Sequence, residues 1–158
     1  LGMQNYVQAG QQSSKGIDFD VNGSLGRGWD VVANYGYSLP RFDDFSEGGV
    51  SRAGRLPRYT QRHAANIWLS KTWTSGLHVA AGSRYLGPQF TNNANTVRLG
   101  GYTVFSGAIG YRIKNWDLSV NAENLFNRQR YFQGSDYDDQ IYPGAPINVF
   151  TTIRYRFQ

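Results

Sequence analysis

The chain has 158 residues, a net charge of +5, a mean hydropathy of −0.52 and no cysteine. This length fits one domain, and the lack of cysteine excludes disulfides, thiol catalysis and zinc–thiolate sites. No run approaches the ~18 apolar residues of a transmembrane helix, so a helical membrane protein is excluded. Glycine (19 residues) and aromatic residues (15%) are abundant while charged residues make up only 17%, which indicates an all-β chain rich in turns.

The positive charge does not point to nucleic acid. It comes from 13 Arg and 3 Lys residues that are scattered along the chain, apart from four arginines of one expected loop: Arg52, Arg55, Arg58 and Arg62. A nucleic-acid binder groups its basic side chains along one groove-facing element. We therefore expect no nucleic-acid partner.

Apolar and polar residues alternate with a period of two in segments of about ten residues, as in half-buried β-strands. About eight strands are predicted, at residues 3–10, 17–22, 29–39, 60–72, 77–85, 103–113, 116–123 and 147–157. In the fourth strand, Ala65, Ile67 and Leu69 are expected to share the apolar face. The order predicts an antiparallel meander.

The expected connections differ systematically in length. Short turns are predicted at residues 25–28, 73–76 and 114–115, whereas long loops are predicted at 40–58, 87–100 and 126–146. Residues 11–14 form a short connection on the long-loop side. Transmembrane β-barrels have short periplasmic turns and long extracellular loops, so this sorting favours a barrel. Because residue 1 already lies in a predicted strand and no signal peptide precedes it, we expect a piece of a longer protein.

The tryptophans support the barrel interpretation. Three of the four lie beside short turns, and only Trp68 lies in mid-strand. Aromatic rings gather at the two interfaces of a membrane. We predict interfacial positions for Trp29, Trp73, Trp116, Tyr155 and Phe157. The alternative is that these rings form the core of a soluble β-sandwich.

Several stretches, in order along the chain, resemble the C-terminal part of the barrel of TonB-dependent ferric-siderophore receptors. They include Ser14–Gly23, Gly28-Trp29, Tyr35-Gly36-Tyr37, Leu56-Pro57-Arg58 and Asn66-Ile67-Trp68. The most specific are Leu99-Gly100-Gly101-Tyr102, the run Asn121-Ala-Glu-Asn-Leu-Phe-Asn127, and Pro143-Gly-Ala-Pro146 with the closing Arg154-Tyr-Arg-Phe157. Two features depart from the family pattern, because Gln158 follows the terminal aromatic residue and Ile147 replaces a common basic residue.

The resemblance implies that residues 1–158 are a C-terminal barrel segment of such a receptor, located in the outer membrane of a Gram-negative bacterium. The family's N-terminal plug, through which TonB acts, is not in the sequence, and eight strands fall short of the family's 22. The implied ligand is a ferric siderophore, with iron present only as part of it and no other cofactor. Outer-membrane lipid and lipopolysaccharide are the other expected partners.

Binding of a bulky, often anionic and partly aromatic siderophore needs aromatic surfaces and arginines, and the long loops contain both. The candidate ligand-binding residues are Arg41, Phe42, Arg52, Arg55, Phe90, Arg128, Arg130, Tyr131, Phe132, Tyr137 and Tyr142.

No catalytic site is expected. His63 and His78 belong to opposite ends of neighbouring strands, roughly 20–25 Å apart, so they cannot share a site. The acidic residues Asp136, Asp138 and Asp139 are interpreted as a solvated loop rather than a calcium site. We therefore predict neither an enzyme nor a metal centre.

Two other architectures remain open at this point. One is a self-contained eight-stranded barrel with a structural or adhesion role, whose narrow interior would be filled by side chains. The polar face instead carries small residues, which favours a wide lumen and a larger barrel: Gly36, Ser38, Ala80, Gly82, Ser106, Ala108, Gly110 and Ser119. The other is a soluble β-sandwich binding module. In any stable form, the first and last strands should be paired.

Overall fold

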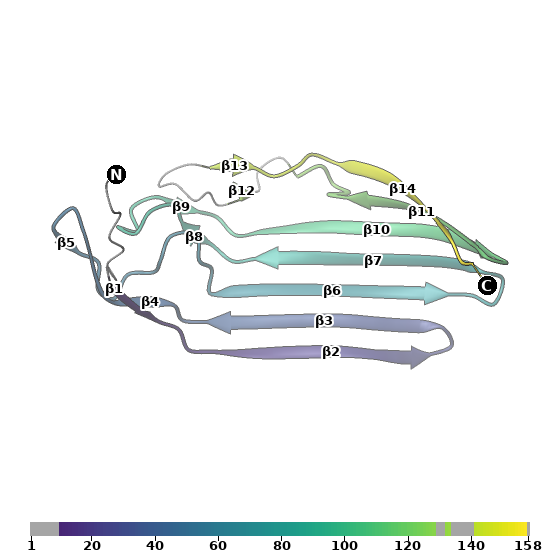
Figure 1. The fold of residues 1–158 in the computed structure, drawn as a ribbon, viewed down its shortest axis with the longest axis horizontal. Helices are drawn as coiled ribbons and strands as arrows, with labels where there is room; N and C mark the ends of the chain where they lie inside the picture. Colours follow the sequence, from purple (N-terminus) through teal and green to yellow (C-terminus); the bar gives the residue numbers. More distant parts are fainter. Residues whose placement is uncertain (1–9, 129–131, 134–140, 158) are drawn as a thin grey trace, which may run out of the picture.

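The computed structural model describes residues 10–128, 132–133 and 141–157. Seven strands pair antiparallel into one sheet in the order β14-β11-β10-β7-β6-β3-β2 (Figure 1). They are β2 (Gly16–Gly26), β3 (Trp29–Ser38), β6 (His63–Thr72), β7 (Leu77–Leu86), β10 (Tyr102–Ile113), β11 (Trp116–Glu123) and β14 (Asn148–Tyr155). The predicted antiparallel all-β meander is confirmed. Of the remaining expected strand at 3–10, residues 3–9 lie outside the described part of the chain.

The strand register places the apolar residues on one face. Ile109 lies opposite Val79 on β7 and Val120 on β11, and successive pairs along the ladder keep this alignment. The expected set Ala65, Ile67 and Leu69 falls on the same face. These side chains are not packed in a core: Phe19 is 62% exposed, Ile109 54% and Ile153 64%. This face therefore needs apolar surroundings to cover its exposed side chains.

In the described residues, no second sheet packs against this apolar face. Three small sheets form instead in the connecting segments. They are β1 (Gly10–Ser13) with β4 (Arg41–Glu47) and β5 (Val50–Ser51), β8 (Gln89–Phe90) with β9 (Arg98–Leu99), and β12 (Phe132–Gln133) with β13 (Tyr142–Pro143). Figure 1 shows them at the end of the sheet opposite the short turns. The soluble-sandwich alternative is therefore wrong. No helix in the described ranges has the length and apolar character needed to span a membrane.

The expected turn at residues 11–14 is wrong. Residues 10–13 form β1, which pairs with β4 inside what was expected to be the loop 40–58. The polar sequence Gly-Gln-Gln-Ser shows no alternation of apolar and polar residues, so the sequence pattern alone does not predict a strand here. The strand forms because these residues pair with β4. The other two long loops likewise contain short strand pairs, β8–β9 and β12–β13.

Glycines on the polar face make room for rings on the neighbouring strand. Trp68 lies opposite Gly82, and a Cβ atom on Gly82 would lie 2.6 Å from Trp68 Cδ2 and 2.5 Å from the Ile67 carbonyl oxygen. His78 occupies the same position over Gly110 on the next pair of strands. Such cross-strand ring–glycine pairs pin the register of a sheet.

The sheet is open within the described residues. Its two edge strands, β2 and β14, each pair with a single neighbour there. The self-contained eight-stranded barrel would require these edges to meet, and in this structure they do not.

Substitution of Gly82 tests the ring–glycine packing. We expect Gly82→Ala to destabilise the folded protein by about 1–3 kcal/mol, because the new methyl group collides with the Trp68 ring and a backbone oxygen. The matched control is Gly23→Ala, since a Cβ atom at Gly23 meets nothing within 4 Å. The measurement is the urea midpoint of unfolding in mild detergent, and equal midpoints for the two variants would contradict the packing argument.

Candidate functional site: the polar face and its loops

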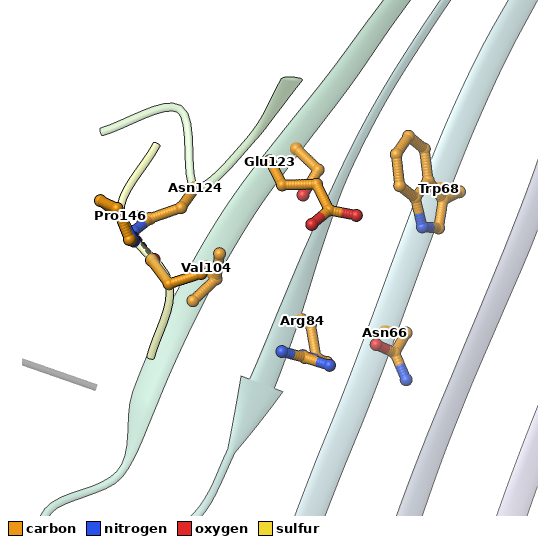
Figure 2. A pocket seen from close by; sticks show the side chains of 9 residues that line it. Asn66, Trp68, Arg84, Val104, Glu123, Asn124 and Pro146 are labelled. Carbon is orange, nitrogen blue, oxygen red and sulfur yellow. Dashed lines mark hydrogen bonds between the residues drawn. The ribbon is translucent and has the colours of Figure 1, made fainter. Parts of the chain in front are cut away.

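A pocket of about 270 Å³ lies on the polar face, towards the long-loop end of the strands. Strands β6, β7, β10 and β11 form it, and residues just after β11 and just before β14 complete it (Figure 2). It is lined by Asn66, Trp68, Arg84, Val104, Ser106, Glu123, Asn124, Ala145 and Pro146. The pocket is therefore built mainly by the sheet rather than by the loops.

The pocket contains two opposite charges, on Arg84 and Glu123, that are not joined in an ion pair within 4 Å. Figure 2 shows the Arg84 side chain on β7 and the Glu123 side chain at the end of β11 in the same pocket. Within the described residues, neither forms an ion pair within 4 Å. An occupant that offers both a hydrogen-bond acceptor to Arg84 and a donor to Glu123 would be stabilised here. Trp68 adds an aromatic surface beside them.

The opposite end of the polar face is neutralised internally. The buried Asp117 carboxylate accepts hydrogen bonds from Arg112 Nη2 at 2.9 Å and Nε at 3.2 Å. The Nε2 atom of His78 lies 3.5 Å from the other Asp117 oxygen. This cluster closes on itself, so we assign it a structural role at the short-turn end of the sheet.

Two of the connecting segments are bound to each other by asparagine side chains. Asn95 accepts a hydrogen bond from the Leu56 amide at 2.9 Å and donates to the Leu56 carbonyl at 2.8 Å. Asn93 accepts from the Arg58 amide at 3.0 Å and donates to Glu47 at 3.0 Å. Segments 40–62 and 87–101 therefore form one unit, which we term the loop pair.

Five of the predicted ligand-binding residues belong to the loop pair. Phe42 stacks on Phe45 with ring centroids 4.5 Å apart, and its amide donates to the Arg55 carbonyl. The backbone carbonyl of Phe90 accepts a hydrogen bond from the Tyr59 amide at 2.7 Å, which joins the two segments. The charges of Arg41 and Arg52 are each engaged, with Asp43 at 3.1 Å and Glu47 at 3.3 Å respectively.

The other predicted ligand-binding residues belong to the last long connection. Arg128 follows β11 and is exposed, Tyr142 lies in β13 and Phe132 in β12. Arg130, Tyr131 and Tyr137, together with the acidic residues 136, 138 and 139, lie outside the described residues. Over residues 10–128, 132–133 and 141–157, no group of three potential ligands could hold a metal ion.

Sequence reasoning missed the pocket itself, because none of its lining residues was predicted to bind ligand. The available signal was that Asn66, Trp68, Arg84 and Glu123 are large side chains on a face otherwise rich in Gly, Ala and Ser. Their convergence from three strands depends on register and could not be read from the sequence alone.

Aromatic residues mark the short-turn ends of the strands. Trp29 begins β3 and Trp73 follows β6, and the ammonium of Lys71 lies 5.5 Å from the centroid of each indole ring. Trp116 and Tyr155 have ring centroids 4.7 Å apart, and Phe157 lies 4.9 Å from Tyr155. Their role at the membrane interface stays a prediction.

A single-layered antiparallel sheet with one apolar and one polar face, short turns at one end and long connections at the other, defines a segment of a transmembrane β-barrel. Comparison with known proteins agrees. The family model described as "TonB dependent receptor-like, beta-barrel" matches residues 2–125. The chain therefore belongs to the TonB-dependent receptor β-barrel family, and its strands lie in the outer membrane of a Gram-negative bacterium.

Individual relatives match nearly the whole chain. The ferrioxamine receptor of Yersinia enterocolitica is 27% identical over 96% of this chain and 22% of the receptor. The structure of the ferric-catecholate import receptor Fiu from Escherichia coli K12 is 27% identical, with a TM-score of 0.74 over 97% of this chain and 22% of that one. The siderophore receptor PiuA from Acinetobacter baumannii gives a TM-score of 0.80 at 21% identity, covering 92% and 22%. The chain thus spans about a fifth of the length of these relatives.

The asparagine clamp of the loop pair can be tested by proteolysis. We expect Asn95→Ala to speed tryptic cleavage at Arg52, Arg55 and Arg58 about tenfold, because it leaves both backbone groups of Leu56 unpaired and loosens the loop pair. Thr96→Val is the control, since the Thr96 hydroxyl accepts its hydrogen bond from Asn92 of its own segment. Similar rates for the two variants would show that the clamp does not hold the segments together.

Proposed function

We propose that this chain forms part of the barrel wall of an outer-membrane receptor that takes up ferric siderophores with energy supplied through TonB. Its relatives include receptors named for ferrioxamine and for catecholate siderophores, and they match 96% of the chain. The observation that carries the proposal is the polar face, where a pocket of the sheet contains Arg84 and Glu123, neither of which forms an ion pair within 4 Å with another described residue. Iron enters this picture only within the siderophore, and the protein contributes no cofactor of its own.

The shape of the polar face supports a wide lumen. Its central positions are small, for example Ala80, Gly82 and Ala108, and the large side chains Trp68, Arg84 and Glu123 gather towards one end. An eight-stranded barrel has an interior just wide enough to be filled with side chains. A face with this many small residues serves better as the wall of a larger barrel whose lumen is occupied by something else.

The loop pair supplies a second contact region at the end of the sheet opposite the short turns (Figure 1). Phe42 and Phe90 offer aromatic surface and Arg55 offers charge, whereas Arg41 and Arg52 contribute by exchanging their partners Asp43 and Glu47 for the ligand. Because the two segments are joined by Asn93 and Asn95, these side chains are held in one preorganised unit, which lowers the entropic cost of binding a bulky ligand. The same role is proposed for Arg128, Arg130, Tyr131, Phe132, Tyr137 and Tyr142.

Transport belongs to the complete receptor, because the chain spans about a fifth of the length of its relatives. We infer that the segment contributes wall and binding surface only. Liposomes containing the segment alone should therefore show no energised uptake of a ferric siderophore, and measurable energised uptake would contradict this division of roles.

Arg84 provides the direct test of the pocket. In the complete receptor, we expect Arg84→Gln to lower the initial rate of ⁵⁵Fe-siderophore uptake about tenfold, because a charged hydrogen-bond donor to the occupant is lost. The assay uses ferrioxamine and a ferric catecholate in a strain lacking its own receptors for them. Arg156→Gln, at the exposed opposite end of the sheet, should leave uptake unchanged. Failure of the unsubstituted receptor to take up either compound would overturn the proposed function.

A further inference from the structure

The pocket of the polar face is built from two rows of residues that run across the strands, and the first row has a gap in its middle. In this row Trp68 lies opposite Gly82, which lies opposite Ser106. The register of β10 with β11 then brings Glu123 next to Ser106, where it ends the row. Neighbouring strands are about 4.8 Å apart, so the backbones of Trp68 and Glu123 are separated by roughly 14 Å with only small side chains between them.

The Trp68 ring turns one of its faces to this gap. A Cβ atom on Gly82 would lie 2.6 Å from Trp68 Cδ2 and 2.9 Å from Cε2, so the indole lies flat over the backbone of β7. The Trp68 residue nevertheless remains 41% exposed. One face of the ring therefore covers Gly82, and the other is open towards the lumen, where it can attract a cation.

Glu123 bounds the gap on the opposite side. Figure 2 shows its carboxylate extending over the sheet towards the Trp68 indole. Within the described part of the chain, this carboxylate has neither a hydrogen bond nor an ion pair. A carboxylate and an indole face on two sides of a small space suit an ammonium ion, which they bind by a charge-assisted hydrogen bond and by cation–π attraction.

The second row offers a site of the opposite kind. Asn66 lies directly opposite Arg84, two residues along each strand from Trp68 and Gly82, so the two rows are roughly 7 Å apart. The Asn66 carboxamide is held by its hydrogen bond to Asn34 at 2.9 Å. The Arg84 guanidinium presents N–H donors that suit a carbonyl or hydroxamate oxygen. Its charge repels an ammonium ion, which confines such a group to the first row.

We propose that this pocket binds the amine-bearing arm of a cationic ferric siderophore, with the ammonium between Trp68 and Glu123 and an amide or hydroxamate oxygen of the same arm at Arg84. An alkylamine is protonated at neutral pH, and an arm of a few methylene groups spans the two rows. A volume of about 270 Å³ takes one arm rather than a whole iron complex.

This inference rests on the proposed function and adds to it the class of siderophore. A tris-catecholate iron complex has a negative net charge and would place part of that charge against Glu123. The same carboxylate that attracts an ammonium arm therefore disfavours such a complex, so that Glu123 acts as a specificity-determining residue.

The test compares two ferric trihydroxamates that differ only at the arm. Ferrioxamine B carries a primary amine there, and its N-acetyl derivative is neutral. Initial rates of ⁵⁵Fe uptake are measured for the complete receptor in a strain lacking its own receptors for both. We expect the KM for the amine form to be about tenfold lower than that for the acetylated form. Glu123→Gln should raise the KM for the amine form about tenfold and so remove this preference.

Two further variants locate the effect. Arg84→Gln should raise the KM for both complexes alike and leave their ratio unchanged, because both carry the oxygen that Arg84 binds. Asp30→Asn is the matched control, since it removes an exposed carboxylate from the polar face outside the pocket. It should leave both KM values unchanged.

The outcomes separate this inference from the proposed function. Equal KM values for the two complexes in the unsubstituted receptor, or a preference that Glu123→Gln leaves intact, would overturn the inference, while uptake itself supports the proposed function. Uptake of a ferric catecholate but of neither trihydroxamate would overturn the inference in the same way. Failure to take up any of these complexes would overturn both.

Discussion

The interstrand hydrogen-bond ladder is the constraint on which the rest of this structure depends. Inside a bilayer, each backbone N–H and C=O group must find its partner within the protein, and antiparallel pairing between neighbouring strands achieves this along the sheet. Once register is fixed, alternation decides which side chain meets lipid and which meets the lumen. A slip of one residue would bring Asp117 and Arg84 to the hydrocarbon side, so the ladder also fixes the chemistry of both faces.

Where the regular ladder ends, buried and half-buried asparagine side chains replace it. Asn93 and Asn95 bind the backbone of another segment, and Asn124 closes the turn after β11. A carboxamide suits this task because it donates and accepts at once and carries no charge that burial would penalise. The left-handed backbone conformations of Asn95 and Asn124 (φ of 57° and 52°) fit the tolerance of asparagine for that region. Among the described residues, the connecting segments have one buried hydrophobic side chain, Leu99, while Tyr102 and Val104 are buried at the start of β10.

The sequence could predict the central sheet because alternation is local. Patterns of residues close together in the chain were enough to predict several elements. These are the strand that begins at Trp29, the strands that contain Ile109 and Leu118, and the short turns beside three tryptophans. Strand β1 could not be predicted, since its only support is the distant β4. The pocket could not be predicted from the sequence for the same reason. Arg84 follows Trp68 by 16 positions and Glu123 follows Arg84 by 39 positions, so these side chains meet only through the register of four strands.

The open edges follow from the same physics that shapes the polar face. Strand β2 is exposed along its whole length, and on β14 the large Phe150 projects from the polar face. Bending the sheet until β2 met β14 would bring Trp68, Arg84 and Phe150 together in an interior that has little room beyond its side chains. Additional strands relieve this crowding, because they pair the edges and widen the lumen around these residues. The distribution of side-chain size over the polar face is thus itself an argument for the larger barrel.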